Sequence, residues 1–253
     1  MRSTLKGLTA LTLISFAAPA LAQDETDPPS EITVSGSATV VTDYRFRGVS
    51  QSDKDFAVQG GLSVNHQSGA YVAIWGSSID DYVAGGSDQE IDFVAGFKKE
   101  VSSGTTLDVG ATYYYYPGAE KFVPGLDTDF VEMYGSVSHT FGPVTGKVLA
   151  AYAPKQSALS VGDGKEDNFY LAGDLSAGIP NTPVSLTAHV GHSFGPSYLT
   201  IGDEYTDWSV GASYTWKNFT AGVSYVDTDK SSISYSGRNI SKAGVVGSIG
   251  VSF

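Results

Sequence analysis

Three charged side chains alternate with aromatic residues in one short run of the chain, Asp-Tyr-Arg-Phe-Arg-Gly, where the charges are Asp43, Arg45 and Arg47. In an extended strand, residues two positions apart point to the same side, so the three charges are expected to share one face. Charged side chains that line a passage select solutes by the sign of their charge. The same three groups would equally suit a structural ion-pair network that closes the mouth of a barrel. The spacing leaves both interpretations open.

Seven further ionisable residues occupy polar positions in other alternating segments of the chain. Their charges are roughly balanced, and glycine and serine neighbours leave space around them. We therefore expect these side chains to face a common, hydrated interior, as charged residues do when they line a pore. The seven residues are Asp92, Lys98, Asp108, Glu132, Lys147, Asp174 and His189.

Patterns that indicate catalysis or metal binding are weak in this sequence. The four histidines show neither an i, i+4 pair nor the spacing of a zinc site. His192 and Ser193 are adjacent, so in a strand they point to opposite faces and cannot form a catalytic dyad with each other. The run from Asp227 begins like a calcium loop, but Ser232 and Arg238 stand where the glycine and the glutamate are needed. The sequence predicts no catalytic residue, no metal and no cofactor.

The elements that must position these charges are strands. Alternation of apolar and polar residues recurs about twelve times between Ile32 and Phe253. No charged residue falls on the apolar side within these segments, which suits contact with lipid, because Arg or Lys at mid-bilayer costs ~2–4 kcal/mol. Aromatic residues gather at the segment ends, where a membrane barrel carries its interfacial girdles. They are Tyr44, Phe46, Tyr113, Tyr115, Tyr152, Trp208, Trp216, Phe219, Tyr225 and Phe253.

The connections between the alternating segments are short and long in turn. Outer-membrane barrels show this asymmetry, with short periplasmic turns and long outer loops. The short connections are 66–69, 100–104, 141–143, 179–183 and 217–218, and the long ones are 48–55, 80–89, 117–128, 154–167, 194–206 and 227–241. We therefore predict an all-β chain that forms a transmembrane antiparallel up-and-down β-barrel of about twelve strands. A soluble lipocalin-type barrel fits less well, because it has about eight strands and an apolar interior.

The first residues read as an export signal. Arg2 and Lys6 precede a short apolar stretch, and Ala20-Leu21-Ala22 resembles a cleavage site. The predicted organisation is a signal peptide (1–22, cleaved after Ala22), a periplasmic linker (23–31) and an outer-membrane barrel (32–253). The chain has no cysteine, which excludes thiol chemistry, and its net charge of −12 argues against nucleic acid as a partner.

Several strings resemble one family. The string Asp43–Gln51 is the most specific, and Gln59–Gly61, Ala73–Asp80, Ile91–Phe93 and Tyr113–Gly118 add to it. Together they resemble the TorF-type porin family, a group of proteobacterial proteins of unknown function. The resemblance implies an outer-membrane β-barrel of porin type, and it implies neither a particular solute nor any catalytic residue.

We expect the protein to allow passive diffusion of small hydrophilic solutes across the bacterial outer membrane. Its expected partners are outer-membrane lipid and such a solute, and homo-oligomerisation is left open. One alternative is a structural or adhesive barrel whose acidic outer loops bind ligands. The other is a lipid-processing enzyme of the outer membrane.

Overall fold

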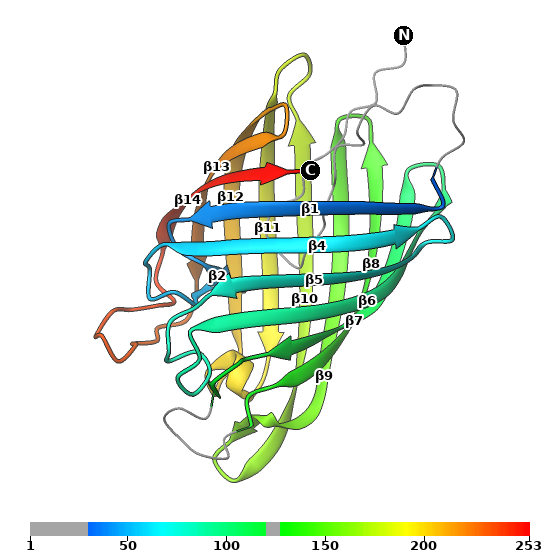
Figure 1. Cartoon of the computed structure of the whole chain (residues 1–253). Helices are drawn as coiled ribbons and strands as arrows, with labels where there is room; N and C mark the ends of the chain where they lie inside the picture. The colour runs from blue at the N-terminus through cyan, green and yellow to red at the C-terminus, as the bar shows by residue number, and fades with distance from the viewer. Residues whose placement is uncertain (1–29, 120–126) are drawn as a thin grey trace.

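The structure is a computed structural model that describes residues 30–119 and 127–253. The predicted signal peptide, its cleavage site and most of the predicted linker lie outside the described residues. Twelve strands of the described chain close into one antiparallel barrel, which confirms the predicted fold (Figure 1). They are β1 (Ile32–Val41), β4 (Ala57–His66), β5 (Ala70–Ser78), β6 (Gln89–Ser102), β7 (Thr105–Tyr115), β8 (Phe130–Phe141), β9 (Val144–Val161), β10 (Gly164–Gly178), β11 (Val184–Phe194), β12 (Tyr205–Trp216), β13 (Phe219–Thr228) and β14 (Gly244–Ser252).

The barrel is closed by its first and last strands. Consecutive strands of the barrel pair with each other all along the wall, beginning with β1 and β4. In addition, the first strand, β1, pairs with the last strand, β14. The main chains of Gly36 and Phe253 exchange two hydrogen bonds, of 2.8 and 3.0 Å, at this junction. Closure leaves no strand edge with unpaired backbone groups, as a sheet surrounded by lipid requires.

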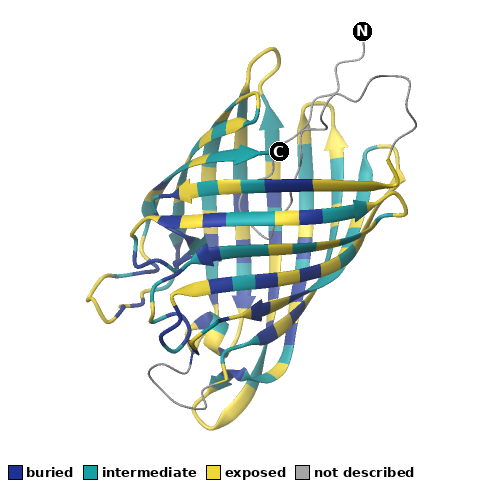
Figure 2. Ribbon diagram, in the orientation of Figure 1, coloured by how far each residue is buried: buried dark blue, intermediate teal, exposed yellow. Residues whose placement is uncertain are grey.

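Alternation along the strands separates an apolar outer side from a polar inner side. Val58 and Val210 illustrate the outer side, where they are 64% and 56% exposed. Ser63 and Thr112 illustrate the inner side and are buried. Chain regions with many buried residues gather at the end of the barrel that carries the long loops (Figure 2). The interior is therefore packed more tightly at the loop end than at the short-turn end.

The prediction of a long loop at 154–167 is wrong. Residues 154–167 continue β9 and β10 as strands, which are joined by a two-residue turn at Gly162-Asp163. Ala158 and Leu159 in this extension are buried, and Leu159 packs into the apolar cluster at the loop end. That packing supports pairing beyond the barrel wall, although register shifts near Glu166 interrupt the ladder.

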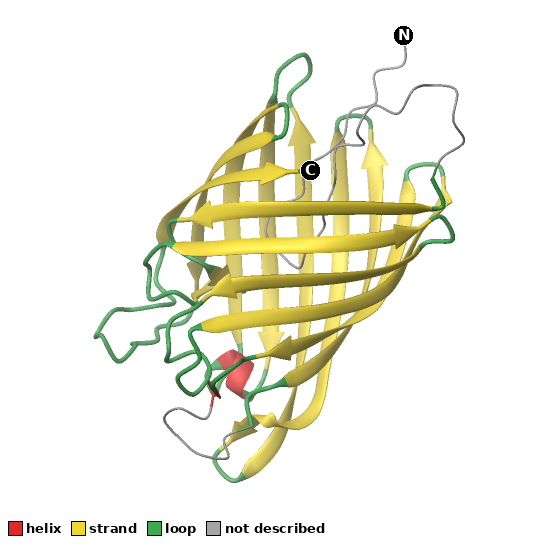
Figure 3. Cartoon of the chain, in the orientation of Figure 1, coloured by secondary structure: helices red, strands yellow, loops and turns green. Residues whose placement is uncertain are grey.

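Helical structure is scarce in the described chain (Figure 3). A 3-10 helix, η2 (Tyr198–Thr200), lies in the connection between β11 and β12. No helix among the described residues is long and apolar enough to cross a membrane.

Candidate functional site

The sequence led us to expect that the run with Asp43, Arg45 and Arg47 continues the first strand, and this expectation is wrong. β1 ends at Val41, and the chain folds back as a small hairpin of β2 (Arg45–Phe46) and β3 (Val49–Ser50). We call residues 43–51 the inward hairpin. The alternation of charged and aromatic residues suits a long strand and a hairpin equally, so periodicity alone could not separate them.

The turn of the inward hairpin consists of Arg47 and Gly48. Both have a positive φ, of 47° and 80°. Two-residue hairpins favour turns with positive φ at both central positions, because their twist matches that of the flanking strands. This turn places the Arg47 side chain at the hairpin tip.

Arg47 binds the wall opposite the strand that precedes it. Its Nη2 donates to Glu132 Oε1 on β8 at 2.5 Å, and its Nη1 donates to Asn168 Oδ1 on β10 at 2.8 Å. The guanidinium also lies over the Tyr170 ring, 4.1 Å from the centroid. Burial disfavours the charged form of Arg47, but Glu132 outweighs it and raises the pKa of Arg47 above its ordinary value. Arg47 therefore stays charged and fixes the hairpin tip across the interior.

The base of the inward hairpin is held by a second ion pair. Arg45 Nε lies 2.6 Å from Asp43 Oδ2, and the Ser50 hydroxyl donates to Asp43 Oδ1 at 2.6 Å. Arg45 Nη1 also donates to the carbonyl oxygen of Ile240 in the β13–β14 connection, at 3.1 Å. These contacts support the structural ion-pair interpretation of the three predicted charges.

Aromatic packing fills the loop end around the inward hairpin. Tyr44 packs edge-on against Trp75, and Phe46 packs edge-on against Tyr114. Tyr44 is only 6% exposed, and its hydroxyl donates to Glu90 at 2.9 Å. Burial, followed by the nearby charge of Glu90, raises the pKa of Tyr44 well above its ordinary value. The prediction that Tyr44 and Phe46 belong to an interfacial girdle is wrong, because the hairpin carries both into the interior.

A second cluster of charges surrounds His189. Its Nδ1 lies 2.7 Å from Asp174 Oδ1 and its Nε2 lies 3.0 Å from Asp207 Oδ1. Lys147 Nζ lies 3.3 Å from the second oxygen of Asp174. The Tyr170 hydroxyl donates to Asp207 at 3.0 Å, so this ring links the His189 cluster to Arg47.

The other predicted interior charges do not join these two clusters. Asp108 accepts a hydrogen bond from the Tyr71 hydroxyl at 2.7 Å. Lys98 is the register partner of Asp108 and is exposed. Asp92 faces the interior beside its register partner Trp75.

Sequence reasoning missed three residues that complete the clusters. Asp207 shares the polar side of its strand with serines, so strand parity was a usable signal for it. Tyr170 and Asn168 lie on the inner side of β10, but neither is ionised at neutral pH and neither stood out among the polar residues. His192 and Ser193 behave as their adjacency predicts: Ser193 is buried against Asn168, whereas His192 contacts Thr206.

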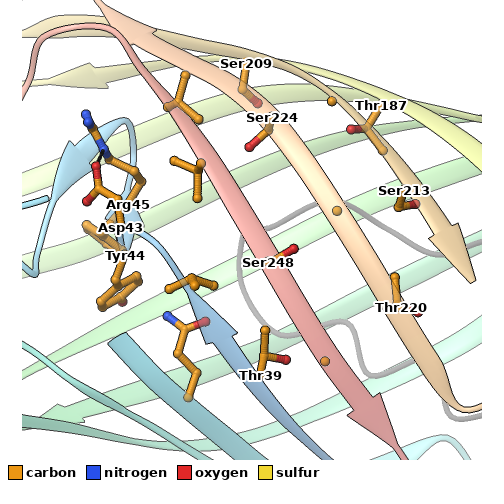
Figure 4. A pocket seen from close by; sticks show the side chains of 18 of the residues that line it. Thr39, Asp43, Tyr44, Arg45, Thr187, Ser209, Ser213, Thr220, Ser224 and Ser248 are labelled. Carbon is orange, nitrogen blue, oxygen red and sulfur yellow. Dashed lines mark hydrogen bonds and ion pairs between the residues drawn. The ribbon is translucent and has the colours of Figure 1, made fainter. Parts of the chain in front are cut away.

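A chamber of about 380 Å³ lies beneath the inward hairpin (Figure 4). Asp43, Tyr44 and Arg45 border it at the loop side, and Asn218 and Ser252 border it near the short turns. Hydroxyl side chains from β1 and β11 to β14 line much of the space between. The interior thus consists of a packed loop end and a hydroxyl-lined chamber that extends toward the short-turn end.

A closed up-and-down barrel of this kind, with an apolar outer side and a polar interior, has the architecture of outer-membrane β-barrels. The chain belongs to the family described as "Bacterial protein of unknown function (Gcw_chp)", whose model matches residues 25–253. No protein with curated annotation matches the sequence.

Solved porin structures share this fold. The NanC porin superposes with a TM-score of 0.57 at 13% identity, covering 87% of this chain and 99% of the porin. The KdgM porin gives a TM-score of 0.56 at 10% identity, covering 87% of this chain and 98% of the porin. The structure of KdgM in complex with disordered oligogalacturonate also gives a TM-score of 0.56, at 9% identity, and covers 87% of this chain and 98% of the porin. At such low identity, the likeness shows the common barrel fold.

Proposed function

We propose that this protein is an outer-membrane porin of the TorF type that allows small hydrophilic solutes to diffuse passively, and that its inward hairpin restricts passage at the loop end. The observation that carries the proposal is the combination of a hydroxyl-lined chamber with a lipid-compatible outer wall. The porin fold of the solved neighbours supports it. Export by the signal peptide (1–22) completes the proposal, and N-terminal sequencing of the mature protein is expected to begin at Gln23.

The inward hairpin sets the level of conduction in this proposal. Its tip is bound to Glu132 and Asn168, and its base is bound to the connection that contains Ile240. We propose that passage through the loop end requires these contacts to break or the hairpin to move. No catalytic role is assigned, since Ser193 is engaged with Asn168 and the neighbouring His192 lies on the other face.

Planar-bilayer recording of refolded protein tests this function. The wild-type chain is compared with a variant in which residues 44–50 are replaced by a Gly-Ser segment of equal length. We expect small or infrequent conductance steps from the wild type and larger, more frequent steps from the variant. Absence of conductance from both proteins, when both are correctly folded, would refute the porin proposal.

A swelling assay then tests for solute passage. Vesicles that contain the Gly-Ser variant are expected to swell faster in small sugars than vesicles without protein, with a rate that falls as the solute grows. Equal rates for protein-containing and empty vesicles would contradict diffusion of hydrophilic solutes.

A further inference from the structure

The wall of the chamber beneath the inward hairpin carries many hydroxyl groups among apolar side chains and glycines. A hydroxyl both donates and accepts hydrogen bonds, so such a wall complements another array of hydroxyls. The volume of about 380 Å³ lies in the range of roughly 300–1,000 Å³ that is typical of small-molecule sites. The nine serine and threonine residues of the lining are Ser37, Thr39, Thr187, Ser209, Ser213, Thr220, Ser224, Ser248 and Ser252.

Cationic groups at the chamber are each matched by a carboxylate. Arg45 is paired with Asp43 and Arg47 is paired with Glu132. His189 lies between two aspartates, one of which is Asp207. Each of these cations therefore has a carboxylate as its counter-charge, although Nη2 of Arg45 has no hydrogen-bond partner within the described residues.

One carboxylate oxygen at the chamber has no partner. Asp92 is 3% exposed and lines the chamber, and its Oδ1 makes no hydrogen bond within the described residues. A buried polar atom without a partner is costly, so a ligand hydroxyl that donates to it would be strongly favoured. The Trp75 ring, which also lines the chamber, is the register partner of Asp92 and contacts Tyr44.

From this arrangement we infer that the chamber binds a neutral polyhydroxylated compound of mono- or disaccharide size. The Ser and Thr hydroxyls exchange hydrogen bonds with the hydroxyls of the ligand, and Asp92 Oδ1 accepts one more. The aromatic rings at the loop side offer an apolar surface for the C–H face of a sugar ring. The inference rests on the proposed function and names the solute class of the same interior.

Tryptophan fluorescence provides a direct readout of binding. The chain has three tryptophans, and Trp208 and Trp216 are on the outer side of β12. The double variant W208F/W216F therefore keeps Trp75 as the single reporter at the chamber. In a micelle of sugar-free detergent, titration with maltose is expected to give a saturable change in its emission. Galacturonate, an anion, is expected to bind at least fivefold more weakly, and glucosamine, a cation, is titrated as the comparison of opposite charge.

Three substitutions in this background locate the site. Ser224→Phe fills the chamber and is expected to abolish the maltose response, whereas Val210→Phe adds a similar ring to the outer side of the adjacent strand and is expected to leave it unchanged. Asp92→Ala removes the unpartnered oxygen and is expected to weaken maltose binding at least fivefold. Folding of each variant is checked by the heat-dependent shift of the barrel in gel electrophoresis.

The outcomes separate this inference from the porin proposal. Tighter binding of galacturonate or glucosamine than of maltose, or no saturable response to maltose, would overturn the neutral-ligand inference. An unchanged response in Ser224→Phe or in Asp92→Ala would also overturn it. Because the titration requires no conduction, silent bilayers together with saturable maltose binding would refute the porin proposal alone.

Discussion

Arg47 and Glu132 are 85 residues apart in the chain, yet the guanidinium Nη2 and the carboxylate Oε1 lie 2.5 Å apart inside the barrel. Both side chains are almost fully buried, at 2% and 1% exposure. The pair connects the tip of the inward hairpin to the opposite wall. The position of the hairpin therefore depends on a contact that can be removed from either side.

Removal of one partner of this ion pair should destabilise the barrel strongly. Arg47→Met or Glu132→Leu leaves a buried charge without its counter-charge, which typically costs about 3–5 kcal/mol. The double variant should recover most of this loss, since two apolar groups replace both charges. Urea unfolding in lipid vesicles measures the three free energies of unfolding. Additive losses in the double variant would show that the two residues do not stabilise each other.

Gly48→Ala should push the inward hairpin out of place. A Cβ at Gly48 would lie 2.4 Å from Thr228 Cγ2 and 2.9 Å from Asp207 Cβ, and the φ of +80° disfavours a side chain as well. Gly237→Ala is the matched control, because its φ is +83° but nothing lies within 4 Å of the added Cβ. Bilayer conductance should rise only in the Gly48 variant. Equal conductance in the two variants would mean that hairpin packing does not limit passage.

Gly191→Ala should weaken the contact between Tyr170 and Arg47. The Tyr170 hydroxyl lies over Gly191, and an added Cβ would be 2.0 Å from this oxygen, so the ring must move. Forced overpacking of this kind typically costs about 1–3 kcal/mol. Gly173→Ala is the control, since open space surrounds that position. Urea unfolding should show a lower free energy of unfolding only for Gly191→Ala. A comparable decrease in both variants would point to a general effect of alanine in the strand.

An arginine on the outer side of the barrel should be poorly tolerated in lipid. Val210→Arg places a charge in the predicted hydrocarbon region and should cost about 2–4 kcal/mol. Ser213→Arg, on the inner side of the same strand, should cost much less because the chamber that it lines carries many hydroxyl groups. Unfolding in vesicles compares the two variants. A Val210→Arg barrel as stable as the wild type would contradict the assignment of the outer side to lipid.

The strands were predictable because alternation is local. Outward positions such as Val58 and Val210 follow directly from the period of two, and so do inward charges such as Glu132 and Asp174. The inward hairpin was not predictable from periodicity, because Asp43, Arg45 and Arg47 alternate in the same way in a strand. The deciding contacts are with Glu132 and Asn168, which are distant in sequence. Gly48 is compatible with a turn after Arg47, but this prediction requires that the glycine be weighted more heavily than the alternation of the flanking residues.

The extension of β9 and β10 escaped prediction for a similar reason. Residues 154–167 contain proline, glycine and charged residues that are typical of a loop. Leu159 is buried in a cluster to which aromatic residues of other strands contribute, Tyr114 of β7 and Phe130 of β8 among them. Local composition carries no information about that cluster.

The junction between β1 and β14 has a consequence for assembly. Every other neighbouring pair in the wall can form as a local hairpin, whereas Gly247 N donates to Thr42 Oγ1 across 205 residues. Pairings between distant segments form slowly, because the chain must lose much conformational entropy before the contacts between the strands can stabilise it. A circular permutant that joins Phe253 to Ser30 and opens the chain between Lys217 and Asn218 would make the pairing of β1 with β14 local. The pairing of β12 with β13 would then join the two ends of the chain and become the slow step of barrel closure.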